Sequence, residues 1–425
     1  MRGKVLAWAM VALGLMVGAP AARADLLFEV NRTNDLPDTA VGDHACDSRP
    51  TLAGDQCTLR AVIQETNMES GFDGIDFNIP GPGVKTIAPS TPLPAITGPV
   101  EIDGYTQGLA HPNTKGVGQG DDAILLVELS GENTPFGTTG LALDPGASGS
   151  VIKGLVINRF STGLLLKANS TIQGNFIGTS PGGKVARPNS FDAIFTEPAN
   201  VQIGGATAAA RNLISGNGRD AINGTGDVNV QGNFIGTQRD GASPLPNVGS
   251  GIELYNSNNT IGGARANVIA FNAVDGITMF NTTQGNSVLG NRIFSNGNLG
   301  IDLGGDGPTP NDAGDADTGA NQRQNFPTIF SATRPSSGGV DITGRLNSTP
   351  SQNFTIEFFR NPPGDEEGSR LIGRFPAVTT NASGFFNFSA HFASPVAVGD
   401  RITATATNAS GSTSEFSRPR TVVAE

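Results

Sequence analysis

An eight-residue motif recurs at a constant interval in the middle of this 425-residue chain. Ile172–Thr179 reads IQGNFIGT, Val230–Thr237 reads VQGNFIGT, and a degraded third copy begins at Val288, so successive copies start 58 residues apart. Between the copies lies a second unit, in which Ile203-Gly204-Gly205 recurs as Ile261-Gly262-Gly263. Internal repetition at a fixed period indicates a chain that stacks equivalent units along one axis.

The repeated units predict an all-β protein with a right-handed parallel β-helix over residues 136–325. Each unit contains short apolar runs, rich in β-branched residues and broken by Gly and Asn, and no unit keeps a helical period. A strand of this kind buries its apolar face only against the next coil. A β-propeller, the alternative repeat fold, needs regular blades of about 40–45 residues, and these unequal units fit it poorly.

Asparagines stand beside the apolar runs at repeated positions. In coils stacked roughly 4.8 Å apart, their side chains can turn inward and hydrogen-bond to the coils above and below. Asn also tolerates the left-handed backbone of a sharp corner. We therefore expect a structural amide ladder, and the alternative is a row of ligand-binding amides. The expected ladder residues are Asn158, Asn175, Asn212, Asn233, Asn267 and Asn291.

Residues 1–24 read as a Sec-type secretory signal peptide. A basic start, an apolar run from Val5 to Ala19 and the A-x-A-like end predict cleavage after Ala24. The apolar run is short for a membrane anchor, so we expect no membrane insertion. Without the three basic residues of this segment, 24 Lys and Arg remain against 38 Asp and Glu, a charge of −14. This charge argues against nucleic acid as a partner, and we expect a secreted, periplasmic or envelope protein.

Residues 25–135 are predicted to hold an N-terminal cap and the first irregular coils. Cys46 and Cys57 are the only cysteines, and a close pair in an oxidising compartment favours a disulfide. The alternative, a zinc site, lacks ligands because only His44 lies nearby. Thr58–Asn67 is the best helix candidate, with Thr58 as its N-cap. A helix here would cover the open end of the solenoid.

Residues 326–425 change to alternating apolar and polar runs separated by turn-rich stretches. About seven short strands in a segment of this length predict a small immunoglobulin-like β-sandwich. The segment has no cysteine pair, so its stability would depend on a Phe-rich core.

Three aspartates are the best candidates for catalysis. Asp192, Asp220 and Asp275 each precede an apolar strand run, in a position that Ser250 occupies in another coil. In aligned coils Asp192 and Asp220 would lie roughly 5 Å apart, near the carboxylate separation of retaining glycosidases. The alternative is that each Asp caps the turn before a strand, as Ser250 does.

An acidic loop between the solenoid and the last domain is a candidate calcium site. Five side chains with oxygen ligands fall within twelve residues, and hard oxygen ligands suit Ca²⁺. The spacing is not that of an EF-hand, because no Glu closes the loop at position twelve. The alternative is a hydrated acidic turn. The five residues are Asp306, Asn311, Asp312, Asp315 and Asp317.

The segment Cys57–Asn67, CTLRAVIQETN, resembles the motif of the CSLREA-domain family. Cys57, Leu59 and Arg60 match the family, whereas Ala61 replaces its Glu. The GNFIGT coils look like those of bacterial right-handed parallel β-helix repeat proteins, of pectin lyase-like fold, that often carry this domain. The resemblance implies an extracellular or envelope protein and supplies no catalytic residues.

The sequence constrains function less than fold, because this superfold hosts enzymes and adhesins alike. We expect an adhesin-like protein that binds an extended ligand, a polysaccharide or cell-surface glycan, along the solenoid. One alternative is a polysaccharide lyase or glycoside hydrolase that acts through the three aspartates. Another is a purely structural envelope module. The sequence leaves the ligand and the oligomeric state open.

Overall fold

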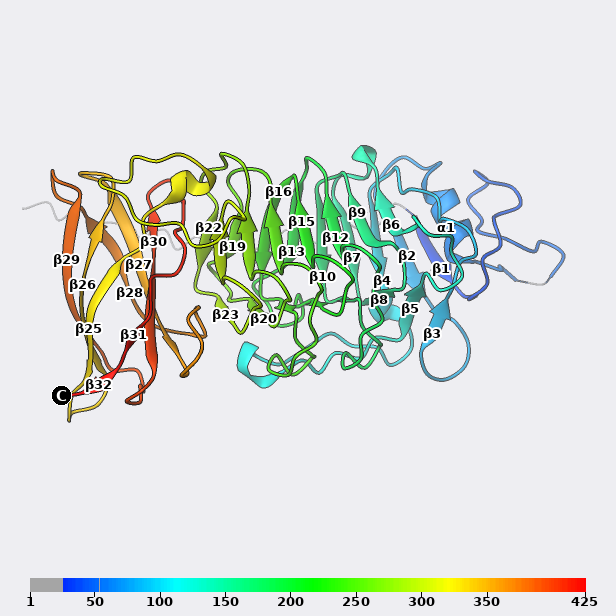
Figure 1. Ribbon diagram of the computed structural model, residues 1–425. Helices are drawn as coiled ribbons and strands as arrows, with labels where there is room; N and C mark the ends of the chain where they lie inside the picture. Colours follow the sequence, from blue (N-terminus) through cyan, green and yellow to red (C-terminus); the bar gives the residue numbers. More distant parts are fainter. Residues whose placement is uncertain (1–25, 53) are drawn as a thin grey trace, which may run out of the picture.

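The computed structural model is an elongated coil stack that ends in a β-sandwich (Figure 1). It describes residues 26–52 and 54–425, and the predicted signal peptide, residues 1–24, lies outside the described residues. Within these ranges, no helix is long and apolar enough to cross a membrane.

Three parallel sheets run along the coil stack, and each full coil contributes one strand to each of them. The nine-stranded sheet contains β1 (Leu27–Val30), β2 (Asp73–Phe77), β4 (Val100–Asp103), β7 (Ser150–Lys153), β10 (Ser170–Gln173), β13 (Asn200–Gly204), β16 (Asp227–Gln231), β19 (Thr260–Gly262) and β22 (Ser287–Leu289). The eight-stranded sheet contains β3 (Lys85–Ile87), β5 (Val127–Ser130), β8 (Leu155–Asn158), β11 (Phe176–Ile177), β14 (Leu213–Ile214), β17 (Phe234–Ile235), β20 (Val268–Ala270) and β23 (Arg292–Phe294). The seven-stranded sheet contains β6 (Thr139–Leu143), β9 (Thr162–Leu166), β12 (Ile194–Thr196), β15 (Ile222–Gly224), β18 (Ile252–Leu254), β21 (Ile277–Met279) and β24 (Ile301–Leu303). This arrangement confirms the predicted parallel β-helix.

The side chains that point inward from the three sheets form one continuous apolar core. Ile172 pairs with Ile203, which pairs with Val230, and all three are fully buried. Because β13 separates β10 from β16 in the sheet, the 58-residue period spans two coils. Each buried aliphatic side chain of this kind stabilises the fold by about 1.5–3 kcal/mol, so the coils hold one another in register.

The predicted amide ladder lies at the corner between the nine- and eight-stranded sheets. The side-chain nitrogen of each Asn donates to Oδ1 of the next, over 2.9 to 3.3 Å. Asn158, which ends β8, bonds to the coils on either side as predicted, but it lies outside the row of Asn–Asn bonds. Its Nδ2 donates to Glu128 at 2.8 Å and to the carbonyl of Thr179 at 2.9 Å. The observed ladder comprises Asn175, Asn212, Asn233, Asn267 and Asn291.

A second amide ladder, which the sequence reading missed, stands at the corner that leads into the seven-stranded sheet. Its members bond in the same way, over 2.9 to 3.0 Å. It comprises Asn189, Asn217, Asn247, Asn272 and Asn296. At the third corner, Asn259 and Asn286 continue the pattern to Asn321. All three corners of the coil therefore carry stacked amides.

The N-terminal end of the stack is covered by α1 (Leu59–Thr66). Oγ1 of Thr58 accepts a hydrogen bond from the backbone of Ala61 at 3.0 Å, as expected of an N-cap. The buried face of this helix joins the solenoid core. Cys46 and Cys57 form the predicted disulfide. Four 3₁₀ turns complete the helical elements among the described residues: η1 (Gly104–Thr106), η2 (Val117–Gln119), η3 (Pro145–Ala147) and η4 (Ala320–Arg323).

Residues 104–125, here termed the strap, cross the outer face of the eight-stranded sheet. In Figure 1 the strap runs beneath the stack, and its residues Ala123 and Leu125 share an apolar cluster with Phe176 and Phe234. The hydroxyl of Tyr105, at the start of the strap, donates to the carbonyl of Gly174 at 2.7 Å. The strap therefore covers part of the outer face of the eight-stranded sheet.

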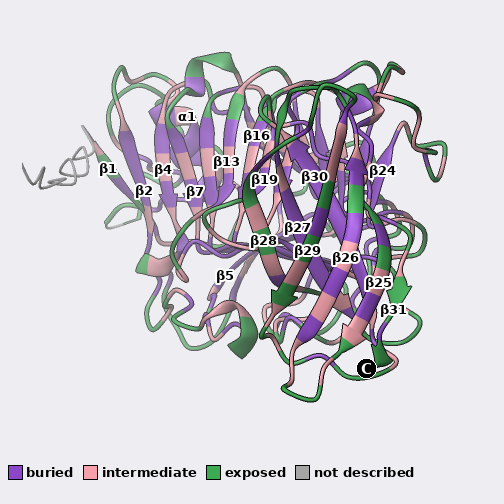
Figure 2. Cartoon of the chain, turned by 90° about the vertical axis from the view of Figure 1, so that its left-hand side faces the viewer, coloured by how far each residue is buried: buried purple, intermediate pink, exposed green. Residues whose placement is uncertain are grey.

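The C-terminal domain is the predicted β-sandwich of two four-stranded sheets. Buried residues alternate along β26 with residues that are half-buried or, in one case, exposed, visible as bands in Figure 2. The ring of Phe358 lies at the centre of the core and contacts Phe375, Phe388 and Phe392. One sheet contains β25 (Thr328–Arg334), β26 (Val340–Asn347), β29 (Phe385–Phe392) and β32 (Val423–Ala424). The other contains β27 (Asn353–Asn361), β28 (Arg370–Thr379), β30 (Arg401–Asn408) and β31 (Arg420–Thr421).

The sandwich docks on the last coil through three buried glutamates. Glu357 accepts a hydrogen bond from the backbone of Gly290 at 2.8 Å, and Glu415 accepts one from the backbone of Leu303 at 3.1 Å. Glu367 bonds to Asn296 at a third place on the same coil. The open C-terminal end of the solenoid is therefore closed by acceptors that the sandwich supplies.

Candidate functional site

The three predicted catalytic aspartates stand in one row at the corner that leads into the seven-stranded sheet. The backbone of Asp220 donates to Oδ1 of Asp192 at 3.3 Å, and the backbone of Ser250 donates to Oδ1 of Asp220 at 2.8 Å. One coil after Ser250, Asp275 accepts from the backbone of Leu299 at 3.0 Å. The structure thus brings Asp192 and Asp220 onto adjacent coils, with Ser250 between Asp220 and Asp275.

These carboxylates are deeply buried. Asp192, Asp220 and Asp275 are 5%, 1% and 4% exposed, and each uses one oxygen to hold the N–H of the same position in the next coil. This geometry matches the turn-capping interpretation of the sequence. A catalytic acid or base would have to reach a substrate atom within hydrogen-bond distance, and buried carboxylates are poorly placed to do so.

A charged cluster that the sequence reading missed lies over this row. The guanidinium of Arg219, half-exposed, lies 3.8 Å from Asp192, 3.2 Å from Asp220 and 3.8 Å from Glu253. Burial raises the pKa of Asp220 to about 6. The motif alignment could have found Glu253, because it follows Ile252, which pairs with the aligned Ile222.

An aromatic pair extends the cluster along the sheet. The hydroxyl of Tyr255 donates to Oε2 of Glu253 at 2.9 Å. Its ring stacks on Phe280, with centroids 4.7 Å apart and planes 14° from parallel. Burial raises the pKa of Tyr255 to about 12, so the phenol stays a proton donor near neutral pH. Arg219 is the shared ion-pair partner of three carboxylates, an arrangement that structural ion-pair networks and functional sites both show.

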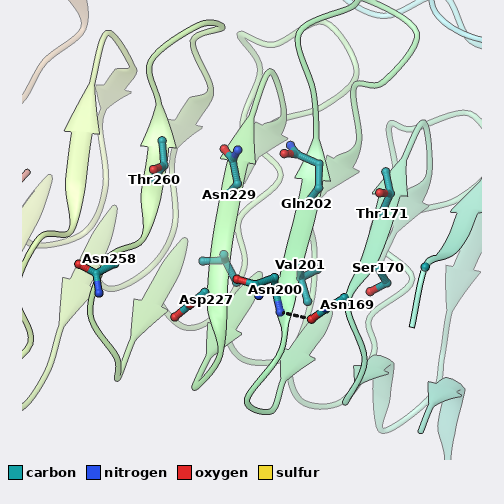
Figure 3. Close-up of a pocket in the computed structure, with 12 residues that line it drawn as sticks. Asn169, Ser170, Thr171, Asn200, Val201, Gln202, Asp227, Asn229, Asn258 and Thr260 are labelled. Carbon is teal, nitrogen blue, oxygen red and sulfur yellow. Dashed lines mark hydrogen bonds between the residues drawn. The ribbon is translucent and has the colours of Figure 1, made fainter. Parts of the chain in front are cut away.

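A polar groove lies on the outer face of the nine-stranded sheet (Figure 3). Its floor is a register-aligned row of outward side chains, in which Thr171 pairs with Gln202, Gln202 with Asn229 and Asn229 with Thr260. The groove has a volume of about 410 Å³. Because neighbouring members of the row sit one coil apart, the row repeats polar groups at roughly 4.8 Å.

The side chains of this row keep free hydrogen-bonding capacity. In the described part of the chain, the hydroxyls of Thr171 and Thr260 have no hydrogen-bond partner. Oδ1 of Asn229 also has none, but this atom is buried. One carboxylate, that of Asp227, lines the groove, and it accepts a bond from Asn256 at 2.6 Å. The groove therefore offers mainly uncharged amides and hydroxyls.

The predicted calcium loop is only partly assembled. The carboxylates of Asp312, Asp315 and Asp317 converge, with one oxygen of each within 4.8 Å of the others. Asp306 instead pairs with Arg323 at 2.8 Å. Asn311 exchanges two hydrogen bonds with the backbone of Phe326. Of the five predicted calcium ligands, the structure therefore brings together three, Asp312, Asp315 and Asp317.

The three remaining carboxylates also hold the loop in place. Asp315 accepts bonds from the backbone of Asn325 at 2.8 Å and from Oγ of Ser348 at 2.7 Å. Burial raises the pKa of both Asp315 and Asp317. Their oxygens are of the kind that Ca²⁺ prefers, and the same contacts serve a hydrated acidic turn.

The fold places this chain among the parallel β-helix proteins, here with a C-terminal β-sandwich. No protein-family model matches the sequence, and no curated protein matches it. The likeness of Cys57–Asn67 to the CSLREA motif therefore stays a sequence prediction.

Proposed function

We propose that this protein acts outside the cytoplasm and binds an extended, uncharged polysaccharide or cell-surface glycan along its nine-stranded sheet. The observation that carries the proposal is the row from Thr171 to Thr260, whose polar side chains repeat once per coil on the floor of the groove. The disulfide between Cys46 and Cys57 supports an oxidising compartment.

The spacing of the row suits a polymer better than a compact molecule. One coil advances roughly 4.8 Å, close to the length of one pyranose residue in an extended glycan, so successive sugars would meet equivalent side chains. Sugar hydroxyls both donate and accept hydrogen bonds, as do the amides of Gln202 and Asn229. A small-molecule site is usually enclosed and mainly apolar, and this groove is polar.

The charge of the protein favours a neutral ligand. The sequence carries 38 acidic residues, and the groove itself contains a carboxylate but neither Lys nor Arg. A polyanionic glycan would be repelled by such a surface. We therefore propose neutral polysaccharides as the ligands of the groove and expect weaker binding of uronic-acid polymers.

The rival function, a polysaccharide lyase or glycoside hydrolase, would use the row of Asp192, Asp220 and Asp275. The feature that favours it is the raised pKa of Asp220, about 6, since a general acid must hold its proton near neutral pH. The burial of all three carboxylates argues for the binding function. The third alternative, a purely structural module, would bind no glycan at all.

A binding and turnover assay tests the proposal. The protein is run through gels that contain neutral or uronic-acid polysaccharides. In parallel, it is incubated with the same polysaccharides in solution, and these mixtures are tested for new reducing ends and unsaturated sugars. We expect retardation without turnover, and we expect the double variant Gln202→Ala/Asn229→Ala to bind at least about tenfold more weakly, the equivalent of roughly 1.4 kcal/mol.

The matched control is Gln238→Ala, in the loop that follows β17 and outside the groove. Equal retardation of the groove variant and the control would exclude this site. Turnover that is lost in Asp220→Asn would instead establish the enzymatic function, and no retention on any glycan would leave the structural one.

A further inference from the structure

Three carboxylates converge at the N-terminal cap, at the opposite end of the molecule from the acidic loop. Glu65 lies on the buried face of α1 and is 0% exposed, and Asp38 is 8% exposed. Asp43 lies at the surface. One oxygen from each of the three carboxylates lies within 4.8 Å of the other two.

This cluster lacks a neutralising partner. Among the residues that the structure describes, no Lys or Arg forms an ion pair with Asp38, Asp43 or Glu65. The carboxylate of Glu65 accepts hydrogen bonds from the backbone N–H groups of Gly42 at 2.8 Å and His44 at 3.0 Å, and the carboxyl of Asp38 lies beside it. The ring of His44 is engaged elsewhere, since its Nδ1 lies 2.7 Å from Glu69.

A second observation points to a ligand. Oδ1 of Asp38 is buried and has no hydrogen-bond partner within the described ranges. Two buried carboxylates side by side cannot both stay ionised without a cation or a shared proton. An orphaned buried oxygen in such a pair is the arrangement that a bound cation would complete.

We propose that Asp38, Asp43 and Glu65 bind a calcium ion that fastens the segment 38–45 to α1. The donors are hard carboxylate oxygens held by an irregular loop, and Ca²⁺ accepts six to eight oxygens in flexible geometry. Mg²⁺ demands a near-ideal octahedron and keeps much of its water. Backbone carbonyls and water would supply the remaining ligands. Cys46 follows the segment directly, so the ion and the disulfide together hold the cap on the solenoid.

Calcium titration of the chelator-stripped protein tests this site, read by calorimetry and by the melting temperature. We expect Ca²⁺ to bind and raise the melting temperature, with Mg²⁺ at least tenfold weaker. Asp43→Asn is the main variant, because Asp43 is exposed and its side chain accepts a hydrogen bond from the backbone of Ala45 that an Asn oxygen can also accept, so this variant should fold. We expect it to weaken Ca²⁺ binding at least tenfold, and Glu65→Gln to abolish it.

The control variant is Asp317→Asn, in the acidic loop, which should leave this Ca²⁺ binding event unchanged. The proposal is overturned if Asp43→Asn binds Ca²⁺ as the unchanged protein does, or if the binding event is lost only in Asp317→Asn. It is also overturned if Ca²⁺ does not bind and acid alone stabilises the cap, because Asp38 and Glu65 then share a proton. Protection of the segment 38–45 from protease by Ca²⁺, in the unchanged protein, is an independent supporting result.

Discussion

Both carboxylate oxygens of Glu367 accept hydrogen bonds from Asn296, one from its backbone at 2.8 Å and one from its side chain at 2.7 Å. Asn296 is the last amide of the second ladder. Within that ladder, the backbone and side-chain nitrogens of Asn272 both donate to Oδ1 of Asn296. Glu367 of the β-sandwich therefore takes the place of the next asparagine and completes the ladder from outside the solenoid.

The joint between solenoid and sandwich should strengthen on mild acidification. Burial raises the pKa of Glu367 and of Glu415 from the usual 4.5 to about 7. A raised folded-state pKa gives a stabilising contribution that is complete below about pH 4.5 and is lost as the pH rises through about 7. We expect a higher melting temperature at about pH 6 than at about pH 8.

The variant Glu367→Gln separates this contribution from those of other buried acids, such as Asp220, that act in the same direction. Scanning calorimetry at both pH values should show a smaller difference for the variant than for the unchanged protein. An identical difference would mean that Glu367 does not titrate in this range.

Removal of one amide from the first ladder should destabilise the solenoid. Oδ1 of Asn233 accepts from the backbone of Asn212 at 3.1 Å and from its side chain at 2.9 Å, so Asn233→Ala removes the acceptor of two buried N–H groups. Nδ2 of Asn212 keeps its other bond, to the carbonyl of Ile172. We expect a loss of about 3 kcal/mol in the free energy of unfolding, measured with urea. The exposed Asn298→Ala should change it by less than about 0.5 kcal/mol, and equal effects would contradict the ladder's role.

Removal of the Arg219 guanidinium should lower the stability of the protein more at high pH than at low pH. Arg219→Gln leaves Asp192, Asp220 and Glu253 without their ion-pair partner. Because Arg219 is half-exposed, we expect a modest loss, about 1–2 kcal/mol near pH 8. The loss should shrink toward pH 5 as the acids become neutral. Urea unfolding at both pH values measures it, with Arg219→Lys as the charge-preserving control.

The strap should become more mobile when the hydrogen bonds from Arg239 are removed. The guanidinium of Arg239 donates to the carbonyls of Asp121 and Ala123, each at 2.8 Å. We expect Arg239→Ala to admit protease cleavage within residues 104–125, detected by mass spectrometry. Arg265→Ala is the control, because Arg265 donates to the exposed carbonyl of Ala206, outside the strap. Equal cleavage rates would show that the apolar contacts alone hold the strap.

The architecture was readable from the sequence because stacking puts equivalent residues at equivalent places. A ladder position demands Asn in every coil, so Asn175, Asn233 and Asn291 mark successive copies of one corner. The repeat did not reveal that Asn158, at the end of β8, bonds to Glu128 and Thr179 and not to another Asn. The alignment of Asp192 with Asp220 also followed from the repeat, whereas their burial did not.

The features that the sequence concealed depend on contacts between distant segments. Arg211 donates to the carbonyl of Gly120 across 91 residues, and no repeat links these positions. Glu367 and Glu415 belong to the β-sandwich, whose sequence does not share the repeat of the coils that these residues cap. In the acidic loop, composition alone could not reveal that Asp306 pairs with Arg323. Pairing partners of this kind are decided by tertiary packing and leave no local pattern.

The amide ladders also bear on how such a protein can lengthen over generations. Each asparagine offers the same donors and acceptors to the coil on either side, so Asn175 meets Asn212 as Asn233 meets Asn267. A duplicated stretch of two coils would find matching neighbours at both junctions without compensating substitutions. The near-identity of Ile172–Thr179 and Val230–Thr237 is what such a tandem copying event leaves behind.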